Sequence, residues 1–304
     1  MKKIIVSGAS GLVGKAFCEY MLKAGFEVYG IARGPEKLKS LTYCPAFHPV
    51  KLDFSQYENI DKHIEIRRPD AFVHLAWNGV LGERDNYRLQ IENITASADA
   101  AKAAAELKAG LFLFVGSAAE QNVSINSAGM TGPCNHYGAA KAAAQKFCRI
   151  IAHESAMNFV GVSLANVISP PPPPVLKSDK SATNIIIRKM LAGERVDLIE
   201  GGRLHDFIYI DDAVAGIYAA MNSGRSGETY YLGGNRLRPF RDFIVEMKEI
   251  LGSNSELCFG AFNDTSFIDY SGIHLYKLYE HTGFRPRVEF GEGIRITARH
   301  IREN

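Results

Sequence analysis

Two side chains that could transfer protons lie four residues apart near the middle of the chain. Tyr137 and Lys141 fall in a helical-looking segment that begins near His136. Side chains four apart share one helix face, so the ammonium can lie near the phenol and favour its ionised form. A tyrosine whose pKa is lowered from about 10 towards neutrality is a competent general acid or base. With 13 tyrosines in the chain, about one such pair is also expected by chance, so the spacing alone leaves the chemistry open.

Three glycines near the N-terminus form a second candidate site. Gly8, Gly11 and Gly14 follow an apolar run and precede a helical-looking segment, which predicts a strand, a tight turn and a helix. Glycine lets the backbone approach a pyrophosphate, whose charge meets free N–H groups and the positive end of the helix dipole. We expect Gly8 to take the turn, Gly11 to lie against the phosphates and Gly14 to let the helix pack on the strand. The spacing differs from the usual Gly-x-Gly-x-x-Gly, and a turn without a ligand is the alternative.

The end of the second predicted strand, Glu27 to Ala32, bears on the choice of cofactor. In dinucleotide folds an acidic residue near this point binds the ribose hydroxyls of NAD, whereas an arginine accommodates the 2′-phosphate of NADP. Here the acid is absent and Arg33 is present, which favours NADP over NAD, although a surface arginine in a loop would look the same. Asp53 follows a third strand at Phe47 to Leu52. It could bond the adenine amino group or cap a helix expected from Ser55 to Arg68.

The elements that must position these residues alternate between strands and helices. Further strands are expected at 71–76, 111–115 and 159–164, and helices at 84–108 and from His136 onward. Such alternation predicts an α/β fold, a doubly wound Rossmann-type parallel sheet with helices on both faces and right-handed crossovers. Five prolines, Pro170 to Pro174, then lead the chain away from the sheet.

Ligands of such sheets bind beyond the carboxyl ends of the strands. Gly8, Arg33, Ala76 and Ser117 all fall at this edge in the predicted sheet. His74 lies within a strand instead, so we expect a hydrogen-bonded core histidine rather than a catalyst.

Composition limits the class of protein. The chain has 304 residues, of which 46% are hydrophobic and 22% charged, and a net charge of +2, so nothing predicts binding to nucleic acid or to an anionic membrane. Five scattered cysteines without a Cys-x-x-Cys pair argue against a disulfide framework and a zinc site, and we expect no bound metal. No apolar stretch reaches membrane-spanning length, and we expect a cytoplasmic protein.

Taken in order, these motifs resemble the extended short-chain dehydrogenase/reductase superfamily, in its branch of nucleotide-sugar epimerases, dehydratases and ketoreductases. The matching segments are the glycine turn, His74-Leu75-Ala76, Gly116-Ser117, Tyr137-x-x-x-Lys141, Asn166-Val167-Ile168-Ser169-Pro170, Asp206 to Asp212, Gly283-Phe284-x-Pro286 and Glu292-Gly293-Ile294. The resemblance implies an NADP-binding Rossmann domain at 1–165 with a returning segment at 206–233. It also implies a smaller C-terminal domain that binds the nucleotide-sugar substrate, at 166–205 and 234–304, and a homodimer packed through helices near 84–108 and 135–155.

The resemblance also assigns roles to residues. Tyr137 would donate a proton, Ser117 would stabilise the developing alkoxide and Lys141 would hold the nicotinamide ribose. The residues that would contact NADP(H) are Gly8, Ser10, Gly11, Leu12, Val13, Gly14, Arg33, Leu52, Asp53, Leu75, Ala76, Tyr137, Lys141 and Ile168. Those that would contact the substrate are Trp77, Ala118, Ala119, Asn166, Arg203 and His205.

Three departures from the family pattern bear on function. Ser163 stands where the family has an arginine, and Ser169 where it has the turn glycine. The segment Ala118-Ala119-Glu120-Gln121 lacks the adjacent Asp-Glu pair of the sugar 4,6-dehydratases, which disfavours dehydration. We therefore predict an NADP-dependent reductase of the 4-keto group of a nucleoside-diphosphate 4-keto-6-deoxysugar. The alternatives are a nucleotide-sugar epimerase with tightly held NAD(P) and a catalytically silent NADP-binding regulator.

Overall fold

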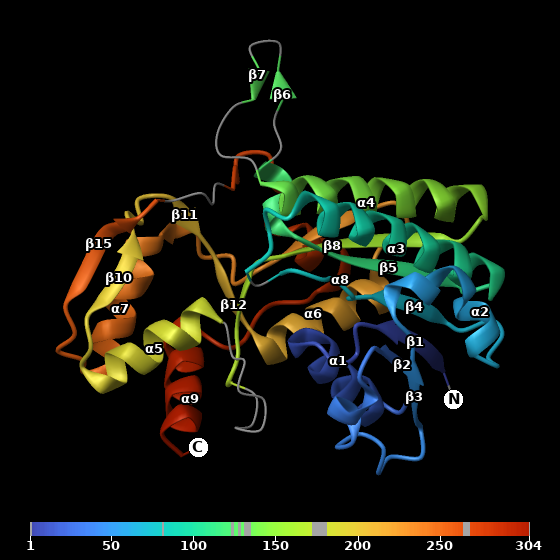
Figure 1. Cartoon of the computed structure of the whole chain (residues 1–304), viewed down its shortest axis with the longest axis horizontal. Coiled ribbons are helices and arrows are strands. Elements are labelled where there is room, and N and C mark those ends of the chain that lie inside the picture. The colour runs from blue at the N-terminus through green and yellow to red at the C-terminus, as the bar shows by residue number, and fades with distance from the viewer. Residues whose placement is uncertain are drawn as a thin grey trace.

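A parallel sheet of seven strands forms the larger lobe of the computed structural model, which describes residues 2–80, 82–122, 125–126, 129–130, 135–171, 181–263 and 268–303 (Figure 1). In spatial order the strands are β3 (Phe47–Lys51), β2 (Glu27–Ala32), β1 (Lys3–Ser7), β4 (Ala71–His74), β5 (Leu111–Ser117), β8 (Asn158–Leu164) and β13 (Thr229–Leu232). Every neighbouring pair is parallel. The predicted Rossmann-type sheet is confirmed, and its strand order reverses between β1 and β4.

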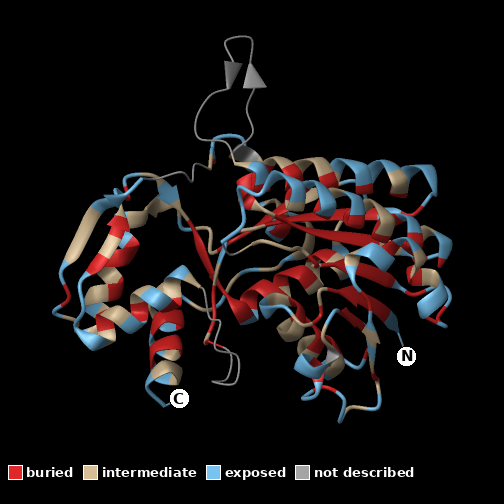
Figure 2. Ribbon diagram, in the orientation of Figure 1, coloured by how far each residue is buried: buried red, intermediate tan, exposed pale blue. Residues whose placement is uncertain are grey.

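Helices cover both faces of this sheet, as predicted. Figure 1 shows α1 (Leu12–Lys23) and α6 (Ile210–Ser223) on one face, with α3 (Tyr87–Glu106) and α4 (His136–Glu154) on the other. Alternate residues of β1 divide between the two layers, because Ile4 belongs to the core under α1 and α6 and Ile5 to the core under α3 and α4. A strand that buries both faces reads as one apolar run, which is why the sequence revealed it. Burial is concentrated in these strands (Figure 2).

A smaller lobe is built from segments that follow β8. It contains α5 (Ala182–Ala192), α7 (Phe240–Leu251) and α9 (Phe290–Glu303), with β10 (Val196–Ile199) beside β15 (Leu257–Phe262) and β11 (Leu204–His205) beside β14 (Arg238–Pro239). The strands β9 (Asn166–Ile168) and β12 (Phe207–Tyr209) pair with each other between the lobes. α8 (Lys277–Thr282) packs instead on α6 and β13 of the larger lobe, so one late segment returns to the sheet.

The remaining described elements are short. They are η1 (Pro35–Leu38), η2 (Phe54–Asn59), α2 (Ile60–His63), η3 (Ala118–Asn122), β6 (Ile125–Asn126) and β7 (Gly129–Met130). None of the helices in the described ranges is long and apolar enough to cross a membrane. Of the five prolines, Pro172 to Pro174 lie outside the described residues.

One expectation about elements was wrong, and one strand was not expected. The helix predicted from Ser55 to Arg68 ends at His63, and its first part is the 3-10 helix η2. Ile64 and Ile66 are both buried with an exposed residue between them, so this stretch is extended and buries alternate side chains as a strand does. The short strand β13 was not predicted. Its place in the sheet depends on pairing with β8, a contact that local sequence does not reveal.

Candidate active site

The glycine turn has the geometry that its sequence predicted. Gly8 has a φ of +73°, and a Cβ there would lie 2.6 Å from the Ala76 backbone nitrogen. A Cβ on Gly14 would overlap the carbonyl oxygen of Gly8. The sharp turn at Gly8 and the close packing at Gly14 are therefore confirmed. Gly11 donates its N–H to the Gly8 oxygen at 2.9 Å, and its place against a phosphate stays a prediction.

The N-terminus of α1 has neither a side-chain cap nor an acidic residue in its first turn, whereas α6 and α7, which also lack a side-chain cap, have aspartates there. Asn86, Asn135 and Ser181 cap α3, α4 and α5 with their side chains. The residue before α1 is Gly11, which offers no cap, and the first turn contains no acidic residue. An uncapped helix start leaves N–H donors and the positive dipole end for an anion. These features fit the pyrophosphate of a dinucleotide at the point where the strand order reverses.

The three residues assigned to catalysis lie at the carboxyl end of β5. Ser117 ends that strand, while Tyr137 and Lys141 occupy the first two turns of α4. A Cβ on Gly138 would overlap the carbonyl oxygen of Ala119, so α4 packs closely on the segment that follows Ser117. Tyr137 and Lys141 are 6% and 4% exposed. The structure therefore brings the buried Tyr137 and Lys141 together with the half-buried Ser117.

Trp77 joins this cluster from the end of β4. Its ring lies edge-on to Tyr137, with the centroids 6.0 Å apart, and the Lys141 Nζ is 3.9 Å from its centroid. The Trp77 Nε1 donates to the Gln90 side chain at 2.9 Å, which fixes the indole. The Lys141 Nζ itself donates to the Val115 carbonyl oxygen at 2.9 Å.

The pKa of Tyr137 is raised rather than lowered, which corrects the expectation from the Tyr137 and Lys141 spacing. Burial is the main cause, and a hydrogen bond with Ser117 and the charge of Arg84 act in the opposite direction. The Lys141 ammonium faces Val115 and Trp77. Burial lowers the pKa of Lys141 to about 7, and the charge of Glu120 offsets part of this effect. A buried phenol with a raised pKa keeps its proton at neutral pH.

Two further residues of this cluster, Arg84 and Glu120, were not predicted from the sequence. The Arg84 guanidinium lies 4.9 Å from the Tyr137 ring centroid, although the Arg84 side chain is exposed and belongs to the loop before α3. The Glu120 carboxylate accepts from the Ser117 N–H at 2.8 Å. Arg84 and Glu120 have no special spacing relative to Tyr137, so only the folded arrangement identifies them.

The remaining residues assigned to the cofactor differ in exposure. Arg33 is exposed and makes no hydrogen bond or ion pair with any described residue. Asp53 caps η2 in a capping box with Gln56, so the capping alternative is confirmed and the adenine contact stays a prediction. The side chains of Leu52 and Ile168 are buried in the core, which leaves only their backbone for a ligand. Ser10, Leu12, Val13 and Leu75 are at least partly accessible, whereas Gly14 and Ala76 are buried.

The residues assigned to the substrate fall in both lobes. Ala118 and Ala119 are buried directly after Ser117. Asn166 is exposed on β9 and donates its amide to the Asp206 carbonyl oxygen at 3.2 Å. Arg203 and His205 lie in the smaller lobe, where the His205 Nδ1 is 3.2 Å from the Arg203 carbonyl oxygen. Their contact with a substrate stays a prediction.

His74 is the core histidine that its position predicted. Its two ring nitrogens lie 2.8 Å from the Ser7 hydroxyl and 3.0 Å from the Ser97 hydroxyl. Burial lowers the pKa of His74 to about 3, so the ring is neutral.

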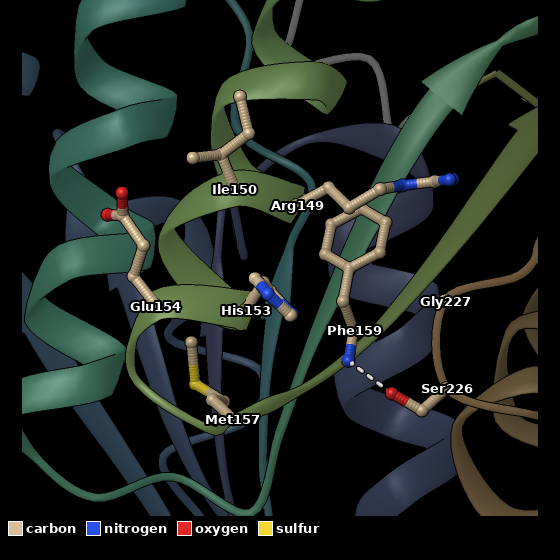
Figure 3. A pocket seen from close by; sticks show the side chains of 8 residues that line it. All are labelled: Arg149, Ile150, His153, Glu154, Met157, Phe159, Ser226 and Gly227. Carbon is tan, nitrogen blue, oxygen red and sulfur yellow. Dashed lines mark hydrogen bonds between the residues drawn. The ribbon is translucent and has the colours of Figure 1, made fainter.

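A cavity of about 460 Å³ lies near the amino end of β8, away from the carboxyl ends of the strands (Figure 3). It is lined by Arg149, Ile150, His153, Glu154, Met157, Phe159, Ser226 and Gly227. Phe159 stands near the amino end of β8, whereas Ser117 pairs with Leu164 at the carboxyl end. This cavity is therefore separate from the candidate active site.

Residues 4–233 match the model of the NAD-dependent epimerase/dehydratase family. The chain belongs to this family. The match covers the glycine turn, the Ser117, Tyr137 and Lys141 cluster and the returning strand β13. The resemblance that the motifs suggested is thereby confirmed at the level of the family and of an enzyme of the short-chain dehydrogenase/reductase type.

Relatives in the family include both dehydratases and epimerases. A dTDP-glucose 4,6-dehydratase of Haemophilus influenzae is 21% identical over 347 residues, covering 98% of this chain and 97% of the relative. A UDP-glucose 4-epimerase of Thermotoga maritima, solved with UDP-glucose, has a TM-score of 0.81 at 21% identity and 99% coverage of both chains. A UDP-glucuronic acid 4-epimerase of Bacillus cereus, solved with UDP-glucuronic acid and NAD, gives the same TM-score, identity and coverage. At these identities the structures establish the shared fold.

Proposed function

We propose that the protein is an NADP(H)-dependent reductase of the 4-keto group of a nucleoside-diphosphate 4-keto-6-deoxysugar. The observation that carries this proposal is the cluster of Ser117, Tyr137 and Lys141, which holds a proton donor and in which the Glu120 carboxylate is already bonded to the Ser117 N–H. Family membership supports a nucleotide sugar as substrate.

The lack of an adjacent Asp-Glu pair in residues 118–121 argues against dehydration. Elimination of water from a sugar needs groups that remove one proton and protonate the leaving hydroxyl. Ala118 and Ala119 cannot do either, and the Glu120 carboxylate is bonded to the Ser117 N–H and the Gln145 amide. The sequence from 121 to 134 contains no aspartate or glutamate. Reduction and epimerisation both remain open to such a site, because each needs only one proton-transferring group.

The residues of the cluster have distinct parts in the proposed reduction. A bound nicotinamide cofactor supplies the hydride. Tyr137 donates its phenolic proton to the carbonyl oxygen, and its raised pKa keeps that proton in place at neutral pH. Ser117 donates a hydrogen bond to the same oxygen and stabilises the charge that develops there. Lys141 donates to the nicotinamide ribose, while Trp77 shields the cluster from water on one side.

Arg33 supports the phosphorylated form of the cofactor. Its side chain is exposed just beyond β2 and makes no hydrogen bond or ion pair with the described residues, so it is available to a 2′-phosphate. The B. cereus epimerase was solved with NAD, but at 21% identity this likeness establishes the fold and not the cofactor. We therefore keep NADP as the proposed cofactor.

We further propose a cytoplasmic homodimer that packs through α3 and α4. Large apolar side chains are exposed on these two helices, namely Tyr87, Ile91, Phe147 and Ile150. Exposed apolar residues that gather on adjacent helices are typical of a protein interface. The four cysteines in the described residues are all free thiols, as a reducing compartment favours.

An epimerase is the second candidate, because two epimerases share the whole fold. The experiment that separates them supplies purified protein with NADPH and a nucleoside-diphosphate 4-keto-6-deoxyhexose. We expect NADPH absorbance to fall in proportion to the product measured by chromatography. Interconversion of sugar nucleotides without added cofactor and without NADPH consumption would establish the epimerase instead.

A further inference from the structure

The Glu120 carboxylate is held behind Ser117 by three hydrogen bonds. One oxygen accepts from the Ser117 backbone N–H at 2.8 Å. The other accepts from the Gln145 amide at 2.9 Å and from the Ser163 hydroxyl at 3.3 Å. Every one of these donors favours the ionised carboxylate, and none is a substrate-facing group.

The surrounding residues leave room for this carboxylate. A Cβ on Gly116 would overlap the Glu120 carboxylate, so a side chain at position 116 would force that carboxylate to move. Ser163 stands opposite Gly116 in the pairing of β5 with β8, and it is small enough to let the carboxylate lie over both strands. Gly116, Ser163 and Glu120 therefore pack together. Ser163, which stands where the family has an arginine, donates its hydroxyl hydrogen bond to Glu120.

The orientation of Gln145 fixes which of its atoms faces Glu120. The Gln145 Oε1 accepts from the Thr229 hydroxyl at 3.1 Å, and Arg149 in turn donates to Thr229 at 2.7 Å. The Gln145 amide nitrogen is consequently left to donate to Glu120. This chain of hydrogen bonds extends from Ser117 to the Arg149 side chain at the cavity of Figure 3.

Glu120 supplies the negative charge that acts on Lys141. The titratable and charged groups that face Glu120 or Lys141 from the adjoining elements are Tyr137 and Cys148 of α4, His74 of β4 and, beside Tyr137, Arg84 of the loop before α3. Burial keeps Cys148 and His74 neutral, because it raises the pKa of the thiol and lowers that of the imidazole. Lys141 is buried, so its ammonium is disfavoured unless an opposite charge offsets the lost hydration.

We propose that Glu120 is a positioning residue, which fixes the backbone at Ser117 and extends to higher pH the range in which the Lys141 ammonium is charged and can hold the cofactor ribose. This inference rests on the proposed function, because it takes Lys141 as the ribose ligand. Glu120 does not touch the substrate, since all of its hydrogen bonds point into the sheet and α4. Burial is the largest influence and raises the pKa of the Glu120 carboxyl to about 7, although the Ser117 N–H, the Lys141 charge and the Ser163 hydroxyl act in the opposite direction.

The test measures cofactor affinity against pH by NADPH fluorescence, which requires no turnover. Glu120→Gln keeps the size of the side chain and removes its charge, so Lys141 should lose its proton at lower pH. We expect the alkaline loss of NADPH affinity to begin about one pH unit lower than in the wild type, the small end of the effect of an opposite charge. Glu106→Gln is the matched control, because Glu106 is exposed at the end of α3 and should leave the profile unchanged.

Two further variants separate charge from geometry. Glu120→Asp keeps the charge but shortens the side chain, so it should lower affinity evenly across pH without moving the alkaline loss. Lys141→Arg keeps its charge at all accessible pH values and should abolish the alkaline loss, whether or not Glu120→Gln folds.

Three outcomes would overturn the proposal. They are an unchanged profile in Glu120→Gln, an affinity loss that is equal at every pH in that variant, and an alkaline loss that persists in Lys141→Arg. Failure of the reductase proposal would look different, as an absence of NADPH consumption while the affinity profiles still shift. A protein that binds neither NADPH nor NADH would contradict both the reductase proposal and the proposed role of Glu120.

Discussion

At the end of β1 the candidate site is made of backbone, whereas at the end of β5 it is made of buried side chains. The first half needs Gly8 and Gly14, where a Cβ would strike the Ala76 backbone and the Gly8 carbonyl. The second half needs Tyr137 and Lys141 together with partners from elsewhere in the chain, such as Trp77. We call the glycine turn at the end of β1 the backbone half and the cluster at the end of β5 the side-chain half. Substitutions in the backbone half should cause steric overlap and weaken cofactor binding, whereas substitutions in the side-chain half should remove chemical groups and lower turnover.

Tyr137→Phe should have the largest effect and should separate turnover from binding most clearly. It removes the proton donor but keeps the ring that packs against Trp77 and Arg84. We expect turnover to fall by about 10²–10⁴ with NADPH affinity nearly unchanged, as measured by steady-state kinetics and a fluorescence titration. Tyr276→Phe, at an exposed tyrosine of the C-terminal segment, is the control. Retained turnover in Tyr137→Phe would refute the proton-donor role.

Arg33→Ala tests whether the backbone half has a side-chain ligand for the 2′-phosphate. We expect NADPH binding to weaken by about 1.5–3 kcal/mol, the range for a hydrogen bond to a charged group, with little change for NADH. Calorimetry with both cofactors measures the difference, and Lys37→Ala removes a neighbouring exposed cation as a control. Equal losses for the two cofactors would show that Arg33 does not recognise the phosphate.

Gly14→Ala tests the steric requirement of the glycine turn. The new Cβ would overlap the Gly8 carbonyl, so α1 must shift, and we expect about tenfold weaker cofactor binding, equivalent to about 1.4 kcal/mol. Gly25→Ala is the control at the other end of α1, where φ is +83° and no atom lies within 4 Å of the added Cβ. It should destabilise the protein by about 1–2 kcal/mol without affecting affinity. The proposed packing role of Gly14 fails if Gly14→Ala binds NADPH as tightly as the wild type.

Arg84→Gln should have the smallest effect, because its guanidinium is exposed. The positive charge lowers the pKa of Tyr137, so its removal raises that pKa and keeps the proton donor protonated to higher pH. At saturating cofactor, the alkaline limb of the turnover profile should move up by a fraction of a pH unit, in the range of about 0.2–1 kcal/mol for exposed charges. Arg88→Gln, whose guanidinium lies 5.8 Å from the Tyr87 ring, is the control. A downward shift would contradict the assigned direction.

The sequence alone allowed six strands of the parallel sheet and the glycine turn of the site to be predicted, because both depend on local patterns. Buried parallel strands are apolar runs, and the turn at Gly8 and Gly14 is encoded by glycine itself. The side-chain half was only partly predictable. The spacing of Tyr137 and Lys141 placed them on one helix face, but burial decides the direction of the Tyr137 pKa.

Residues that act through tertiary contacts were not predictable from spacing. In the sequence, Glu120 is one charged residue after Ser117 and nothing marks it. Its role follows from the fold, in which its carboxylate lies beside Gly116 and Ser163, two residues that pair across β5 and β8. Arg84 belongs to a charged loop in which nothing marks it from its neighbours. The strand β13 was missed because its position beside β8 depends on a return of the chain after α6.

The central claim is that a hydride passes from an exchangeable cofactor to the substrate while Tyr137 supplies the proton. The most direct test uses NADPH carrying deuterium at the transferred position of its nicotinamide ring, with mass spectrometry and NMR of the sugar product. The account predicts one deuterium per product molecule, located at C4 of the sugar. Product that carries no deuterium, or that forms without added NADPH, would contradict it.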